Sequence, residues 1–187
     1  MKNTVVIYSS KYGYTAQYAG WIAEELSCRL AERSDFSAAD FSRYDIIIYG
    51  GGLYAGGVSG ISLITKNFDK IKDKDIILFT CGLADPLKPQ NTEHIKKSLE
   101  NVLTPQMREK IKLFHLRGGI DYSRLGVVHK AMMGMMRRVI LHKGRESMSE
   151  EDKQLVDTYG ERVDFTDRES IKPLTDFAKE LMAESVL

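Results

Sequence analysis

The chain has 187 residues, of which 43% are hydrophobic and 28% charged, and its formal net charge is +1. These values are ordinary for a globular domain with one sizeable core. No run approaches about 18 apolar residues, which argues against a transmembrane helix. A net charge near zero argues against nucleic-acid binding. Two cysteines, Cys28 and Cys81, are too few for a disulfide framework, and neither they nor the four histidines show metal-ligand spacing.

The chain begins with an apolar run that predicts a buried strand over about residues 3–8 and leaves no room for a signal peptide, so we expect a cytoplasmic protein. A loop rich in hydroxyl groups follows, and the spacing of apolar residues then predicts a helix over about 14–31. Such a corner points backbone N–H groups at one spot on the positive end of the helix dipole, which suits a phosphate. Gly13 permits close approach of the backbone, and Ser10 and Thr15 can each donate a hydrogen bond.

Strand and helix patterns alternate through the middle of the chain. A weak second strand is predicted near 34–37. Further strands are predicted at 45–50, 75–81 and 112–117, and helices at about 60–69 and 91–103. This order is typical of a doubly wound parallel sheet.

After Gly119 the alternation stops. Residues 121–148 hold a helical stretch with four methionines and a basic excess, made up of Arg124, Lys130, Arg137, Arg138, Lys143 and Arg145. Two interpretations are open: a surface for an anionic membrane or an acidic, apolar substrate, or a helix whose methionines lie in the core. A short acidic helix is predicted at 149–158 with Ser149 as N-cap, then a return to the sheet edge at 162–165 and a final helix at 167–184.

The first loop resembles the phosphate loop of the flavodoxin superfamily, whose pattern is met by Tyr8, Ser10, Gly13, Thr15 and Ala19. The resemblance implies a flavodoxin-like α/β fold, a five-stranded parallel sheet in the order 2-1-3-4-5. It also implies a single FMN-binding domain over 1–187, with an insertion at about 121–161. The cofactor would lie at the carboxyl ends of the strands, near the switch point. The alternative is an ordinary strand–loop–helix corner with chance hydroxyls.

Three loops would then meet around FMN. The second, at 50–60, is rich in glycine and carries an aromatic that can stack on a flat ring; the alternative is a flexible loop with an exposed tyrosine. In the third, at 81–89, we expect the Asp85 side chain to cap the following turn. The FMN-binding residues that the resemblance implies are Ser10, Lys11, Tyr12, Gly13, Tyr14, Thr15, Gly52, Leu53, Tyr54, Ala55, Gly56, Cys81, Gly82, Leu83 and Ala84.

One branch of the superfamily is more similar than the rest: the menaquinone-dependent protoporphyrinogen IX dehydrogenases. The resemblance lies in Gly118 to Tyr122, in the basic insertion 123–148, and in Phe165-Thr166-Asp167. It implies an FMN-dependent enzyme of porphyrin biosynthesis that passes electrons from a porphyrinogen to a quinone or a redox protein. It also implies peripheral contact with the inner membrane through 121–145. No residue is assigned as an acid–base catalyst, and no metal is expected.

Two alternatives remain open. One is an electron-transfer flavodoxin without a small-molecule substrate, although such carriers are typically strongly acidic and this chain is not. The other is a flavodoxin-like module that has lost FMN and binds a partner.

Overall fold

A computed structural model describes residues 2–54 and 57–184, which form two compact units. The first unit runs up to Gly118 and resumes at Thr166. The second unit is Gly119–Phe165. Within the described residues, no helix is both long and apolar enough to span a bilayer.

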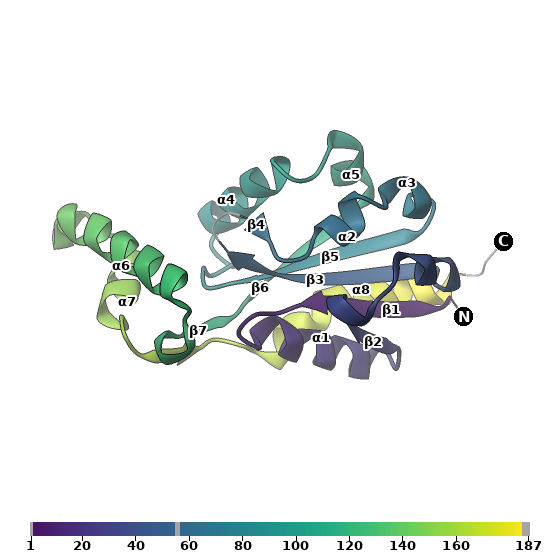
Figure 1. Cartoon of the computed structure of the whole chain (residues 1–187), viewed down its shortest axis with the longest axis horizontal. Coiled ribbons are helices and arrows are strands. Elements are labelled where there is room, and N and C mark those ends of the chain that lie inside the picture. The colour runs from purple at the N-terminus through teal and green to yellow at the C-terminus, as the bar shows by residue number, and fades with distance from the viewer. Residues whose placement is uncertain (1, 55–56, 185–187) are drawn as a thin grey trace. The chain divides into compact units, whose positions relative to one another are not determined.

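The first unit is built on a parallel sheet (Figure 1). Its strands are β1 (Thr4–Ser9), β2 (Arg29–Glu32), β3 (Ile46–Tyr54), β5 (Asp75–Gly82) and β6 (Lys112–Arg117), and the order is β2-β1-β3-β5-β6. Counting only the parallel strands, this is the expected order 2-1-3-4-5, so the predicted fold class is confirmed. A short strand, β4 (Gly57–Val58), pairs antiparallel with the end of β3.

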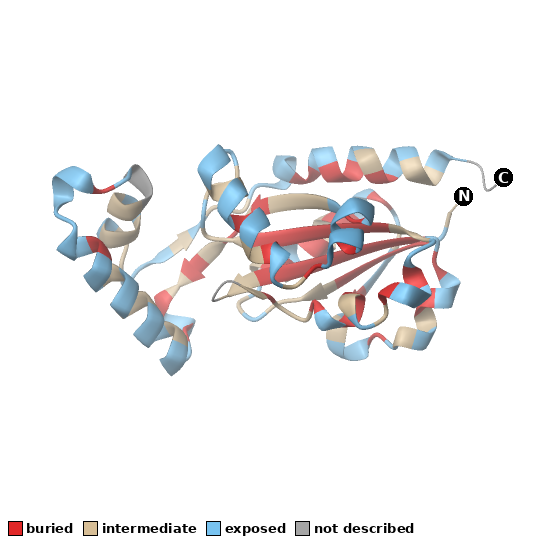
Figure 2. Cartoon of the chain, turned by 90° about the horizontal axis from the view of Figure 1, so that it is seen from above, coloured by how far each residue is buried: buried red, intermediate tan, exposed pale blue. Residues whose placement is uncertain are grey.

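Helices cover both faces of this sheet, as Figure 1 shows. One face carries α1 (Tyr14–Glu25) and α8 (Lys172–Ala183), and the other carries α2 (Ser62–Thr65), α3 (Phe68–Ile71), α4 (Pro89–Glu100) and α5 (Pro105–Lys110). Because strand side chains alternate, Val5 and Ile7 enter the core under α2–α5 while Val6 enters the core under α1 and α8. Figure 2 shows the buried strands between these layers.

The first predicted helix was too long, and the second strand was placed too late. The helix ends at Glu25, where Ser27 takes a left-handed conformation with φ of 48°. The chain then reverses, and β2 occupies Arg29–Glu32 instead of 34–37. Leu30 continued the helical spacing in the sequence, but β2 is an edge strand that buries only Ala31, so it has no strand-like apolar run.

Three other elements differ from the sequence-based predictions. The helix expected at 60–69 is two short helices, separated where the Asn67 amide donates a hydrogen bond to the Leu63 carbonyl. The helix α5 was missed, although Thr104 caps it and Pro105 opens it. The third strand continues through the glycines that were assigned to a loop.

The second unit contains a two-stranded antiparallel sheet and two helices. The sheet pairs β7 (Gly119–Asp121) with β8 (Arg162–Asp164), and the helices are α6 (Val127–His142) and α7 (Glu150–Asp157). The capping box of Ser149 and Asp152 begins α7 as predicted. The predicted return of 162–165 to the main sheet was wrong: β8 pairs with β7, and Arg162 stands opposite Asp121, a pairing of opposite charges.

Candidate functional site

The first loop connects β1 to α1 and turns on Gly13. This glycine has φ of 99°, a left-handed conformation that other residues adopt at a cost. Its N–H donates a hydrogen bond to Ser10 Oγ over 3.1 Å. Gly13 is the N-cap residue of α1 and supplies no capping side chain, and no acidic residue lies in the first turn of the helix. The first helical turn therefore carries no negative side chain of its own.

A hydroxyl cluster joins the first loop to the second. Ser9 Oγ and Ser59 Oγ are 2.8 Å apart, and the Tyr49 hydroxyl donates a hydrogen bond to the Ser59 carbonyl over 2.9 Å. Gly60 is packed so tightly here that a Cβ would lie 2.3 Å from the Tyr49 hydroxyl. Burial raises the pKa of Tyr49, so the phenol stays protonated and remains a donor.

A contact between Tyr12 and Tyr54 also joins the first loop to the second. The rings of Tyr12 and Tyr54 meet edge to face, with centroids 5.8 Å apart and planes at 76°. Lys11 Nζ lies 5.8 Å from the Tyr12 ring centroid. Burial raises the pKa of Tyr54, and hydrogen bonds from the backbone of Lys11 and Tyr12 act in the opposite direction. The Tyr54 phenol therefore contacts the backbone of the first loop.

The third loop closes the other side of the site. A Cβ on Gly118 would lie 2.7 Å from Cys81 Sγ and 3.4 Å from Tyr14 Cβ, so the ends of β5, β6 and the first loop are in close contact. A Cβ on Gly82 would lie 3.0 Å from Leu53 Cδ1. The carboxyl ends of β3 and β5 thus meet where the sequence predicted two walls of one site.

Arg117 fixes the conformation of the third loop. Its Nε donates a hydrogen bond to the Leu83 carbonyl over 3.2 Å, and its Nη1 lies 3.7 Å from Asp85 Oδ2. The other Asp85 oxygen accepts a hydrogen bond from the Leu87 N–H over 3.0 Å. Asp85 thus caps the turn, the role preferred for its side chain from the sequence.

A half-buried histidine lies on the neighbouring strand β6. His115 Nδ1 is 2.8 Å from Thr80 Oγ1, and burial lowers the pKa of His115 to about 4. The imidazole is therefore neutral near pH 7.

The structure brings some of the predicted site residues together. Tyr12 of the first loop contacts Tyr54, and Leu53 packs closely on Gly82. Gly118 packs between Cys81 and Tyr14. Thr15 is buried in the first turn of α1, and Ala84 is exposed beyond β5. Ala55 and Gly56 lie outside the described residues. Sequence reasoning missed Ser59 and Arg117, which tie loops together from positions that no motif marks.

The first loop fits an anionic group. The left-handed glycine, the positive end of the α1 dipole with no acidic residue in its first turn, and the neighbouring Lys11 all favour negative charge at this corner. The described part of the chain contains no group of three His, Cys, Asp or Glu side chains arranged to hold a metal ion.

Comparisons with known proteins agree with this architecture. The family described as flavodoxin domain matches residues 5–149. No curated protein matches the chain.

Several solved structures match part of the chain. One is a flavoprotein in complex with FMN from Lactobacillus acidophilus, with 16% identity, a TM-score of 0.41, and coverage of 63% of this chain and 93% of that chain. Another is oxidised Flavodoxin 2 from Bacillus cereus, with 19% identity, a TM-score of 0.41, and coverage of 62% and 85%. A third is two-electron reduced Megasphaera elsdenii flavodoxin, with 14% identity, a TM-score of 0.41, and coverage of 60% and 82%.

Proposed function

Since this chain belongs to the flavodoxin domain family, we propose that it binds FMN at the three loops and acts as an FMN-dependent oxidoreductase. The observation that carries this proposal is the first loop. Gly13 turns the backbone in a left-handed conformation at the N-cap position of α1, and no carboxylate lies in the first helical turn. These features suit the phosphate of FMN.

Each loop has a separate part in the proposed site. Ser10 and the N–H groups at the start of α1 would hold the phosphate. Tyr12 and Tyr54 would contact the flat ring, since aromatic faces of this kind stack on conjugated rings. The segment from Cys81 to Ala84, held by Arg117, would face the opposite edge of the ring. When bound, FMN supplies the redox chemistry, and these residues orient it and exclude water.

We further propose that the activity is that of a quinone-linked dehydrogenase, similar to the protoporphyrinogen IX dehydrogenases. The near-neutral net charge favours this proposal over an electron carrier, because carriers use a strongly acidic surface to steer redox partners. The basic segment 121–145 within the second unit also favours it, since such a segment is not needed by a carrier. The alternative is a flavodoxin-type carrier whose acceptor is a redox protein.

Absorbance spectroscopy tests the cofactor first. Purified protein is mixed with FMN, separated from free flavin and scanned. Bound flavin with bands near about 375 and 450 nm supports the proposal, because the bands belong to the flavin and the protein only tunes them. No flavin uptake would instead favour the third alternative, a module that binds a partner without cofactor.

Turnover then separates dehydrogenase from carrier. The FMN-loaded protein is incubated with protoporphyrinogen IX and a menaquinone analogue, and porphyrin fluorescence is followed without oxygen. Quinone-dependent porphyrin formation supports the dehydrogenase. Absence of turnover, together with rapid reduction by a flavodoxin reductase, would assign the protein to the carriers.

A further inference from the structure

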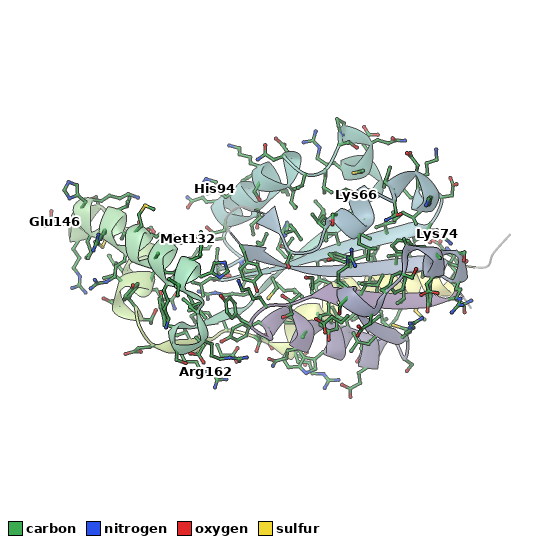
Figure 3. All side chains as sticks on the ribbon, in the orientation of Figure 1. Lys66, Lys74, His94, Met132, Glu146 and Arg162 are labelled. Atoms are coloured by element: carbon green, nitrogen blue, oxygen red, sulfur yellow. The ribbon has the colours of Figure 1, made fainter. Side chains whose placement is uncertain are left out.

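An arginine lies on the face of α6 that packs within the second unit. Met133, Arg137 and Ile140 follow one another at steps of four and three residues, so they lie on one side of the helix. Ile140 is buried and Met133 half-buried, whereas the other three methionines of α6 are exposed. The interpretation in which the methionines lie in the core therefore applies to Met133 alone. Arg137 is half-buried where an apolar side chain would ordinarily lie. Figure 3 shows the side chains of this unit, with Met132 labelled on α6.

The guanidinium of Arg137 has no polar partner within the described part of the chain. Its Nε is buried and makes no hydrogen bond, and no other buried side-chain nitrogen or oxygen of the described residues is left in this state. Its two Nη groups also have no hydrogen bond or ion pair with a described residue, and since they are not buried they face solvent. A buried polar group without a partner costs free energy, so native structures seldom keep one unless a group from outside the chain satisfies it.

Two tyrosines hold this guanidinium in place. Its Cζ lies 5.0 Å from the ring centroid of Tyr159, whose ring lies 4.8 Å from that of Tyr122. A Cβ on Gly134, three residues before Arg137, would lie 3.3 Å from the Tyr159 hydroxyl, so this ring packs directly on α6. Attraction between a cation and an aromatic face orders the long arginine side chain before any ligand binds. We call Arg137, Tyr122 and Tyr159 the Arg137 cluster.

The Arg137 cluster offers only hydrogen-bond donors and a positive charge. A guanidinium cannot accept a hydrogen bond. Burial raises the pKa of Tyr122, so its phenol keeps its proton, and neither tyrosine hydroxyl of the cluster has a hydrogen-bond partner among the described residues. Residues 122–145 contain no Asp or Glu. Two acidic side chains of α7 lie beside other cations, Asp152 beside Lys143 and Asp157 beside Arg145. The cluster therefore suits an anion.

We propose that the Arg137 cluster binds a carboxylate group of the substrate. A planar guanidinium can donate two parallel hydrogen bonds to a planar carboxylate. The single charge of Arg137 matches that of a carboxylate, whereas a phosphate ester carries about −1.5 to −2 near pH 7. The rings of Tyr122 and Tyr159 would contact the apolar group that bears the carboxylate. This inference rests on the proposed function, in which the substrate is a porphyrinogen with two propionate side chains.

Porphyrin binding by the full chain tests the proposal. Protoporphyrin IX, which keeps both propionates, is titrated into the protein while its absorbance is followed. Its dimethyl ester, which has the same ring without the two charges, is titrated in parallel. We expect the diacid to bind at least about tenfold more tightly than the ester, because hydrogen bonds to an ionised carboxylate are stronger than those to an ester.

Two neighbouring arginines provide a matched pair of variants. Arg137→Gln should bind the diacid about tenfold more weakly and should no longer distinguish it from the ester. Its affinity for the ester should equal that of wild type, which shows that the unit is still folded. Arg138 is the next residue and is exposed, so Arg138→Gln should keep the wild-type preference for the diacid. Arg137→Lys keeps the charge without the planar pair of donors and should keep only part of the preference.

The possible outcomes separate this inference from the proposed function. A wild-type preference for the diacid in Arg137→Gln, or equal losses in Arg137→Gln and Arg138→Gln, would overturn the carboxylate site alone. Loss of affinity for the ester in both Arg137→Gln and Arg137→Lys would assign Arg137 a structural role and would also overturn it. A wild-type protein that binds neither porphyrin would overturn the site and the porphyrinogen substrate together, while FMN uptake would stand as a separate result.

Discussion

The ring of Tyr54 lies edge to face against the ring of Tyr12, with the two centroids 5.8 Å apart. Tyr54 comes from the end of β3 and Tyr12 from the loop after β1, so this pair joins the two loops around the proposed FMN site. Hydrogen bonds from the backbone of Lys11 and Tyr12 reach the same phenol. The aromatic pair is therefore a direct test of whether these loops act as one site.

Removal of the Tyr54 ring should weaken FMN binding. We expect Tyr54→Ala to raise the dissociation constant about fivefold, since aromatic contacts contribute about 1 kcal/mol beyond burial. Quenching of FMN fluorescence during titration measures the constant. Tyr159→Ala is the matched control, because it removes an aromatic partner of Tyr122 in the second unit and should leave FMN affinity unchanged. Equal effects of the two variants would contradict the assignment.

Replacing Gly13 or Gly20 of α1 by alanine should change the free energy of unfolding in opposite directions. Gly13→Ala forces a side chain into a left-handed conformation and should lower the free energy of unfolding by about 1 kcal/mol, with a loss of FMN affinity. Gly20→Ala places a methyl in open space within α1 and should raise stability by about 0.5–1 kcal/mol. Urea denaturation gives both values. A stabilised Gly13→Ala protein with full affinity would exclude the proposed turn.

Arg117 should matter for cofactor affinity more than an ordinary surface arginine. Arg117→Gln removes the bond to the Leu83 carbonyl and the charge beside Asp85. We expect FMN affinity to fall about three- to tenfold, as hydrogen bonds from charged groups contribute about 1.5 kcal/mol. Isothermal titration calorimetry is suitable. Arg108→Gln, which breaks an exposed ion pair with Glu100, is the control and should have no effect.

His115 should make the protein sensitive to acid. Its pKa is lowered to about 4 in the fold and is 6.5 for the ordinary group, so the unfolded chain takes up a proton first as the pH falls. Stability is therefore lost as the pH falls below 6.5. Allowing for partial exposure, we expect wild type to lose about 2 kcal/mol more than His115→Gln between about pH 7 and 4.5. Parallel urea titrations at the two pH values measure this difference, and identical losses would refute it.

The hydroxyl of Tyr18 should contribute to the stability of the first unit. It donates a hydrogen bond to the Arg117 carbonyl over 2.7 Å and accepts one from the Asp167 N–H over 3.1 Å. Tyr18→Phe leaves both groups without this partner, so we expect a loss of about 1–3 kcal/mol. Tyr44→Phe removes a hydroxyl that accepts a bond from Arg29 and should cost less than about 1 kcal/mol. Thermal unfolding of the two variants gives the comparison.

The buried strands were predictable because each is a continuous apolar run, as in Ile46 to Tyr49. Their order in the sheet came only from the resemblance to the flavodoxin superfamily. The position of the second strand was not predictable, since β2 is an edge strand with one buried residue and has no continuous apolar run. The glycines at the end of β3 were also misleading, because they were assigned to a loop. Gly50 lies in the strand, and it is a glycine because the Phe79 ring fills the space of a side chain: a Cβ there would lie 2.1 Å from the ring. This contact with the neighbouring strand β5 cannot be inferred from the residues around Gly50.

The candidate site divides in the same way. The positions of Ser10 and Gly13 follow from local spacing, so the sequence predicts the first loop. The bond from Arg117 to Leu83 spans 34 positions and that from Ser9 to Ser59 spans 50, and no local pattern encodes them. The pairing of β7 with β8 was missed for the same reason. A strand was expected at 162–165, but its partner β7 has three residues, too few for a periodic signal.

The pairing of β7 with β8 and the hydrogen bonds of Tyr18 together make the second unit exchangeable. Gly119 is paired with Asp164, so the unit begins and ends at one place, and the flanking residues Arg117 and Asp167 share the Tyr18 hydroxyl. A segment whose two ends are held together can be replaced without changing the connections of the main sheet. Related chains should therefore differ in this segment in length and surface chemistry while the strands of the first unit keep their register. Recombinant chimaeras that trade the segment between relatives would then redirect the protein without rebuilding its core.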